Sequence, residues 1–108
     1  MVINIFKEED LELAKALPQQ VKEVIKDNLK ILEENYGTER TVKDLGGYIA
    51  LVDEEEVVTF KEEILKGTIA EYIDDIEGAD YISALFLLSS DFAIVVICEK
   101  KLREILEQ

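Results

Sequence analysis

The sequence predicts a small α+β protein in which four helices pack on an antiparallel sheet of about four strands. Residues 81–100 read YISALFLLSSDFAIVVICEK, which is two apolar runs of strand length joined by a short polar turn. Residues 19–36 repeat apolar side chains with the period of an amphipathic helix. The length of 108 residues suits one modest core, so we expect residues 1–108 to form a single domain.

The first helix is expected over residues 8–17. Glu8, Glu9 and Asp10 would occupy its first turn, where the helix dipole favours negative charge. Residues 1–6 alternate weakly between apolar and polar side chains. They are either a short edge strand or an extended lead-in.

The second helix, over residues 19–36, has the clearest pattern in the chain. Pro18 suits its first turn, because the N–H that proline lacks has no partner there. Gly37 is a suitable residue to end the helix, and residues 38–45 form a polar connection. The apolar face consists of Val21, Val24, Ile25, Leu29, Ile31, Leu32 and Tyr36.

The middle of the chain predicts a buried strand and a third helix. After Gly46-Gly47, which give the backbone freedom at a bend or bulge, the apolar run 48–52 is strand length. Asp53 can cap a helix over residues 54–66, with Glu56 as its capping partner. Residues 57–60 can also be interpreted as a strand, but the cap favours the helix.

The remaining elements are an edge strand, the hairpin and a last helix. Residues 69–76 alternate apolar and acidic side chains, and charges on an edge strand prevent further pairing. The hairpin strands are expected at 81–88 and 92–98, and the last helix at 99–107.

Both faces of the predicted hairpin are apolar. A half-solvated antiparallel sheet normally has one polar face. Either helices cover both faces, or one face binds another molecule, which includes a homodimer formed through an apolar sheet face.

The composition restricts the partners and the location of the protein. The net charge of −13 argues against direct binding of nucleic acid or of anionic lipid, and it favours a basic protein partner. No apolar run is long enough for a membrane span, and the N-terminus lacks the pattern of a signal peptide. Because Cys98 is the only cysteine, no internal disulfide is expected and we predict a cytoplasmic protein.

The residue types argue against catalysis and cofactors. The chain has no histidine, and a single cysteine cannot build a zinc site. Cys98 in an apolar strand would be an inert thiol. Residues 74–80 superficially resemble a calcium loop, but aligning Gly78 with the glycine of such a loop puts Ile73 at the first ligand position. We therefore expect no metal, no cofactor and no enzymatic activity.

The acidic residues concentrate between Asp53 and Asp80. This segment holds eleven acidic residues against two lysines, a net −9 of the total −13. If its helix and edge strand lie side by side, they form an acidic partner surface. The candidate residues are Asp53, Glu54, Glu55, Glu62, Glu63, Glu71, Asp74, Asp75 and Glu77.

Three functions fit these observations. The first is a non-enzymatic protein-interaction module of the inhibitor, immunity or regulatory type. The second is a DNA-mimic, anti-restriction-type decoy whose carboxylates imitate phosphates, although Lys22, Lys26 and Lys30 do not fit it. The third is a small enzyme that uses carboxylates.

Four sequence segments also carry a resemblance. They are EENYG (33–37), LGGYI (45–49), EYIDDI (71–76) and YISALFLLSSDFAIVV (81–96). With these, the chain resembles small uncharacterised bacterial proteins of prophages and other mobile elements. The resemblance implies no activity and no functional residue, but it favours roles in defence, counter-defence or immunity.

Overall fold

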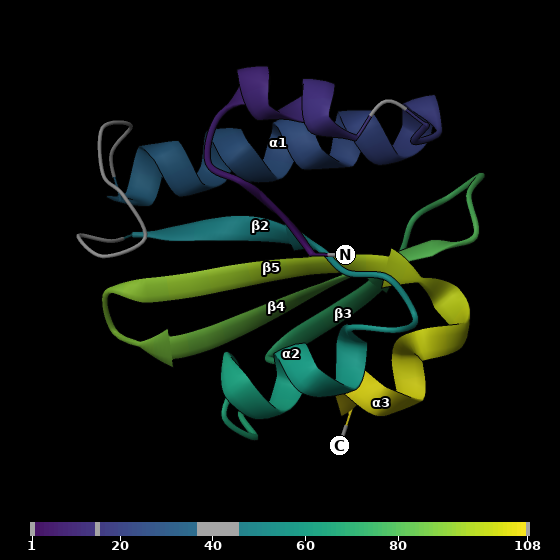
Figure 1. Cartoon of the computed structure of the whole chain (residues 1–108). Helices are drawn as coiled ribbons and strands as arrows, with labels where there is room; N and C mark the ends of the chain where they lie inside the picture. Colours follow the sequence, from purple (N-terminus) through teal and green to yellow (C-terminus); the bar gives the residue numbers. More distant parts are fainter. Residues whose placement is uncertain (1, 15, 37–45, 108) are drawn as a thin grey trace.

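A mixed five-stranded sheet lies between two layers of helices (Figure 1). The computed structural model describes residues 2–14, 16–36 and 46–107. The predicted helix stop at Gly37 and the connection 38–45 lie outside the described residues. In chain order the elements are β1 (Ile3–Ile5), the 3-10 helix η1 (Glu8–Leu13), α1 (Gln19–Tyr36), β2 (Gly47–Leu51), α2 (Val57–Glu63), β3 (Tyr72–Asp75), β4 (Tyr81–Ser89), β5 (Phe92–Glu99), the 3-10 helix η2 (Lys100–Leu102) and α3 (Arg103–Glu107).

The strand order is β1-β2-β5-β4-β3, and one pair is parallel. Strand β2 runs parallel to β5, whereas the other neighbours are antiparallel. The prediction of about four antiparallel strands is therefore only roughly right. The chain leaves β2 through α2 and the β3–β4 hairpin, so that β5 returns beside β2 in the same direction. The additional strand is β1 at the edge of the sheet, so residues 1–6 contain a short edge strand rather than only an extended lead-in.

The α1 prediction is confirmed with its bounds, but the other helices are shorter than predicted. The helix expected over 8–17 is a 3-10 helix that ends at Leu13. Pro18 restricts Leu17 to extended conformations, which prevents a continuous helix into α1. The helix expected over 99–107 is divided into η2 and α3, because Glu99 still belongs to β5.

Helix α2 also begins later than predicted, at Val57 rather than at residue 54. The Asp53 carboxylate does act as a cap, but on the preceding turn, where its Oδ1 accepts a hydrogen bond from the Glu56 N–H at 3.1 Å. The alternative of a strand over 57–60 is wrong. The edge strand expected over 69–76 is limited to β3, from Tyr72 to Asp75.

Gly46 and Gly47 allow close contacts at the start of β2. Gly47 has a φ of 125°, and a Cβ atom there would lie 2.1 Å from the carbonyl oxygen of Ala93 on β5. A Cβ atom on Gly46 would lie 2.3 Å from the Cβ of Tyr36 at the end of α1. The two glycines therefore let β2 enter the sheet beside β5 and directly under the end of α1.

Two hydrophobic clusters lie on the two faces of the sheet, as Figure 1 shows by the helices above and below it. One cluster joins the sheet to α2 and α3, and its sheet residues include Ile82, Ala84, Phe86, Ile94, Val96 and Cys98. The other joins the sheet to α1 and η1, and its sheet residues include Ile49, Leu51, Val95 and Ile97. Helices thus lie on both faces of the hairpin, which was one of the two alternatives.

Candidate functional site

Strand β4 is covered more fully on one side than on the other. Towards α2 and α3, Ile82, Ala84 and Phe86 are fully buried. Towards α1, Tyr81, Ser83 and Leu85 are only half-buried, and Leu87 is 43% exposed. Because side chains alternate along a strand, the two sets face opposite sides of the sheet. The α1 layer therefore leaves part of β4 open.

The open part of β4 forms the floor of a groove between α1 and the β3–β4 edge of the sheet. Its cavity volume is about 450 Å³. We call it the open groove and define it by Asn28 and Ile31 on α1, Tyr72 and Asp74 on β3, and Ser83 and Leu85 on β4. On α1, Asn28 and Ile31 follow Val24 at i+4 and i+7, which places all three on one face of the helix.

The open groove combines exposed apolar side chains with an acidic group. Ile31 is 53% exposed and Tyr72 is 61% exposed, although both are large and apolar in most of their surface. Asp74 makes no ion pair with any residue that the structure describes. The described residues that line the groove include carboxylates but no lysine or arginine. The groove is therefore apolar with a negative rim.

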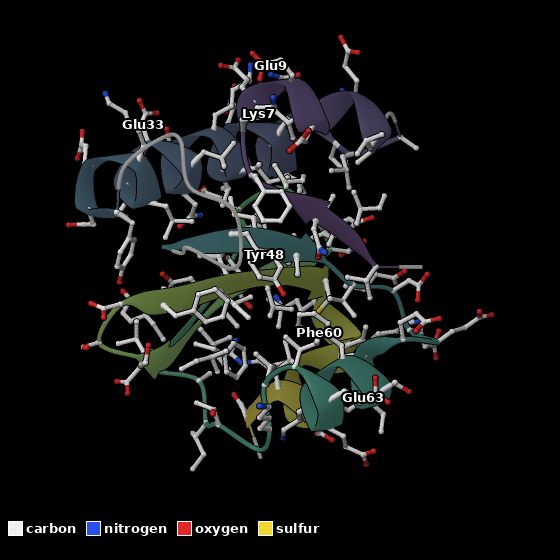
Figure 2. The ribbon with its side chains drawn as sticks, turned by 60° about the vertical axis from the view of Figure 1, so that its left-hand side comes forward. Lys7, Glu9, Glu33, Tyr48, Phe60 and Glu63 are labelled. Atoms are coloured by element: carbon white, nitrogen blue, oxygen red, sulfur yellow. The ribbon has the colours of Figure 1, made fainter. Side chains whose placement is uncertain are left out.

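The nine acidic residues that the sequence singles out do not lie on one face. Asp53, Glu54 and Glu55 lie in the turn before α2, and Glu62 and Glu63 lie at its end. Figure 2 shows Glu63 pointing away from the sheet, on the opposite side of the molecule from Glu33 on α1. Five of the nine carboxylates thus belong to α2 or the turn before it, whereas the other four lie in or beside β3.

The β3 carboxylates are also divided between the two faces. Glu71 precedes β3 and Glu77 follows it. Within the strand, Asp74 pairs with Ser83 and lines the open groove. Asp75 also borders this cavity, but it lies opposite Ile82 and its carboxylate contacts Lys100 of η2 and Arg103 of α3.

A group of basic residues from η2 and α3, which we call the basic cluster (Lys100, Lys101 and Arg103), neutralises part of the acidic segment. Lys101 Nζ lies 2.7 Å from Glu54 Oε2, and this hydrogen bond raises the lysine pKa. Arg103 Nη1 lies 3.0 Å from Asp75 Oδ1, and Lys100 Nζ lies 3.4 Å from Asp75 Oδ2. Glu54 and Asp75 are therefore paired within the chain.

Sequence reasoning missed the basic cluster because it lies far along the chain from the carboxylates it contacts. Its signal was the segment K-K-L-R at 100–103, three cations within four residues. Apart from Glu54 and Asp75, and from Asp53, which caps the turn before α2, six of the nine predicted residues make no ion pair with a described residue. They are Glu55, Glu62, Glu63, Glu71, Asp74 and Glu77.

Cys98 lies inside the core between the sheet and α2–α3 and is 1% exposed. Burial raises the pKa of its thiol to about 12, and the nearby Glu99 carboxylate adds to this shift. The thiol is therefore protonated near neutral pH.

Within residues 2–14, 16–36 and 46–107, no three His, Cys, Asp or Glu side chains are grouped so that they could hold a metal ion.

The described structure thus offers two candidate sites, the open groove and the six carboxylates without an ion pair to a described residue. No helix in the described part of the chain is long and apolar enough to cross a membrane. The chain matches no protein-family model, no curated protein and no solved structure.

Proposed function

We propose that this chain is a non-enzymatic protein-interaction module, of the inhibitor, immunity or regulatory type, that binds a basic protein. The observation that carries the proposal is the open groove, where exposed apolar side chains lie next to the unpaired carboxylate of Asp74. Fully buried interface centres are apolar and rich in aromatic residues, and their rims are polar. Tyr72 and Ile31 fit such a centre, and Asp74 fits such a rim.

The net charge of −13 supports a partner of opposite charge. Potentials that complement each other increase the rate of association and disfavour incorrect partners. Glu71 and Glu77 flank β3 and extend the negative potential beyond the open groove. A basic partner is also consistent with the cytoplasmic location and the immunity roles that the sequence favours.

The positions of the carboxylates favour binding over catalysis. None of the described Asp and Glu residues is buried. A carboxylate acting as a general acid or base usually has a pKa shifted by burial or by a like charge. The decoy alternative is less favoured, because the basic cluster interrupts the carboxylates that would imitate phosphates.

Affinity capture with charge-reversed variants tests the proposal. The tagged chain is incubated with a lysate of its source cells, and the captured proteins are identified by mass spectrometry. One variant combines Glu71→Lys with Asp74→Lys beside the open groove, and a matched variant combines Glu62→Lys with Glu63→Lys on α2. We expect the unmodified chain and the α2 variant to capture the same basic protein, and the groove variant to lose it.

Loss of the captured protein by the α2 variant, with capture retained by the groove variant, would locate the interface on α2. Equal capture by all three proteins would contradict a binding surface that depends on acidic residues. Circular dichroism and urea unfolding serve as controls that each variant is folded, since all four substituted side chains are exposed.

A further inference from the structure

We infer that the open groove binds one basic amphipathic α-helix of the partner protein, which completes the helix layer on the α1 side of the sheet. This inference rests on the proposed function and specifies the structure of the bound segment. Its basis is the shape of the groove, the exposed side chains within it and its charge.

The two strands that the α1 layer covers incompletely together have the width of one helix. Neighbouring strands lie about 4.8 Å apart, so β4 and β3 together are about 10 Å wide. An α-helix with its side chains is about 10–12 Å across. Packed helices lie about 8–10 Å apart, so a helix on β4 and β3 would also contact the α1 residues Asn28 and Ile31.

The exposed apolar residues are placed to contact such a helix from two sides. Ile31 approaches from α1, whereas Tyr72 approaches from β3 and Leu85 lies on the floor between them. An amphipathic helix presents apolar side chains at i, i+3, i+4 and i+7, which suits a groove with apolar residues on both walls and on its floor. Tyr72 is of the aromatic type that often dominates binding energy.

Charge argues against a second copy of this chain as the bound molecule. Two chains of net charge −13 repel each other, and Asp74 of each would lie in the interface with only Arg103 of its own chain, beyond ion-pair distance, as a described cation. A lysine or arginine of a partner helix would instead form an ion pair with Asp74. The open groove therefore favours a basic helix over self-association.

Strand addition to the edge of the sheet is also less favourable. Strand β3 is only four residues long, and two of them are Asp74 and Asp75. Short, charged edge strands are a common protection against pairing with another strand. The hydrogen-bonding edge is thus protected, while the face of the sheet beside it is open.

A designed peptide pair tests the inference by fluorescence anisotropy. The first probe is a fluorescein-labelled peptide of leucine and lysine, about 14 residues or about 21 Å long as a helix, with leucines at i, i+3, i+4 and i+7. The second has the same composition with leucine and lysine in strict alternation, which favours a strand. We expect the helical pattern to bind at least about tenfold more tightly than the alternating one.

Three variants with identical changes of charge separate groove binding from general attraction. Ile31→Glu and Tyr72→Glu place a carboxylate in the open groove, while Val58→Glu places one at a 49% exposed position on α2. All three raise the negative charge, so simple attraction would tighten binding of the basic peptide. We expect Ile31→Glu and Tyr72→Glu to weaken binding by about tenfold or more, and Val58→Glu to change it by less than about twofold.

Several outcomes would overturn the inference. Binding that is equal or tighter in the two groove variants would show that charge alone holds the peptide. Preference for the alternating peptide would indicate strand addition, and a dimer in sedimentation that Ile31→Glu dissociates would show that a second copy fills the groove. If affinity capture still depends on Asp74 while the peptide result fails, the interaction module remains and only the bound helix is wrong.

Discussion

The two sides of β4 differ in burial although both are rich in apolar residues. Phe86 is fully buried against α2 and α3, while the adjacent Leu87 is 43% exposed on the α1 side. The neighbouring residues Ala84 and Leu85 show the same contrast in a weaker form. What lies above each face therefore decides burial, and the apolar character of the strand alone does not.

The positions of the helices in the two layers explain the difference. Helices α2 and α3 are short and pack against each other, and Lys61 Nζ donates a hydrogen bond of 2.6 Å to the carbonyl oxygen of Ile105. Two short helices side by side cover a wide area of the sheet. In the α1 layer, α1 packs on β2 and η1 packs on β1 at the opposite edge of the sheet, so the cover does not extend fully to β4 and β3.

Replacing a side chain on each side of β4 with alanine should give the largest difference in the free energy of unfolding. We expect Phe86→Ala to lower the free energy of unfolding by about 3–5 kcal/mol, because it leaves a cavity in a closed core. Leu85→Ala should cost only about 1–2 kcal/mol, since its side chain is already half in contact with water. Urea unfolding measures both values, and equal losses would contradict the difference between the two faces.

Substitution of Gly47 tests the close contact between β2 and β5 in the middle of the sheet. Gly47→Ala should cost about 2–3 kcal/mol, because φ of 125° is unfavourable for alanine and its Cβ would collide with the Ala93 carbonyl oxygen. Thermal unfolding checks the loss. Gly67→Ala is the matched control, since φ there is 76° but nothing lies within 4 Å of the added Cβ, and it should be the milder change.

Alkaline pH should destabilise the covered side through Cys98. Its thiol pKa is about 12 in the folded chain, against 9.0 for an ordinary cysteine thiol. The unfolded state therefore releases this proton first, and the contribution of the thiol is complete below pH 9 and is lost as pH rises towards 12. Between pH 8 and pH 10 the unmodified chain should lose about 1 kcal/mol more than Cys98→Ala. The free energy of unfolding of both proteins is measured across this pH range, and an equal loss in the two would contradict a contribution from the Cys98 thiol.

The surface ion pairs should have the smallest effect. We expect Asp75→Asn to change the free energy of unfolding by less than about 1 kcal/mol, because Asp75, Lys100 and Arg103 are all substantially exposed. Glu77→Gln, which removes a carboxylate without a described ion pair, is the control. The difference between the two variants should disappear in about 1 M salt, where the screening length falls to about 3 Å.

Local patterns predicted the elements that depend on neighbouring residues. The period of apolar residues gave α1 with its observed bounds, because one face of that helix packs on the sheet along much of its length. The two apolar runs around Ser90 and Asp91 gave the β4–β5 hairpin within one residue at its ends. In both cases the residues that determine the structure are close in the sequence.

Non-local contacts explain what the sequence did not predict. The parallel pairing of Gly47–Leu51 with Ala93–Ile97 has no local pattern that distinguishes it from an antiparallel pair, although burial on both faces is typical of parallel strands. The pairing of Asp75 with Arg103 divides the predicted acidic surface. The open groove depends on the position of α1 over the sheet, and only the apolar character of both hairpin faces hinted at it.

The pairing of β2 with β5 also determines the order in which the protein can fold. Gly47 pairs with Ala93, so the centre of the sheet joins segments from the two halves of the chain. Val21 and Ile25 on α1 pack in the cluster that contains Val95 and Ile97. During synthesis, α1 and β2 therefore emerge from the ribosome before their β5 partners exist. A high contact order of this kind slows folding, and it exposes the apolar surface of the nascent chain until β5 has been translated.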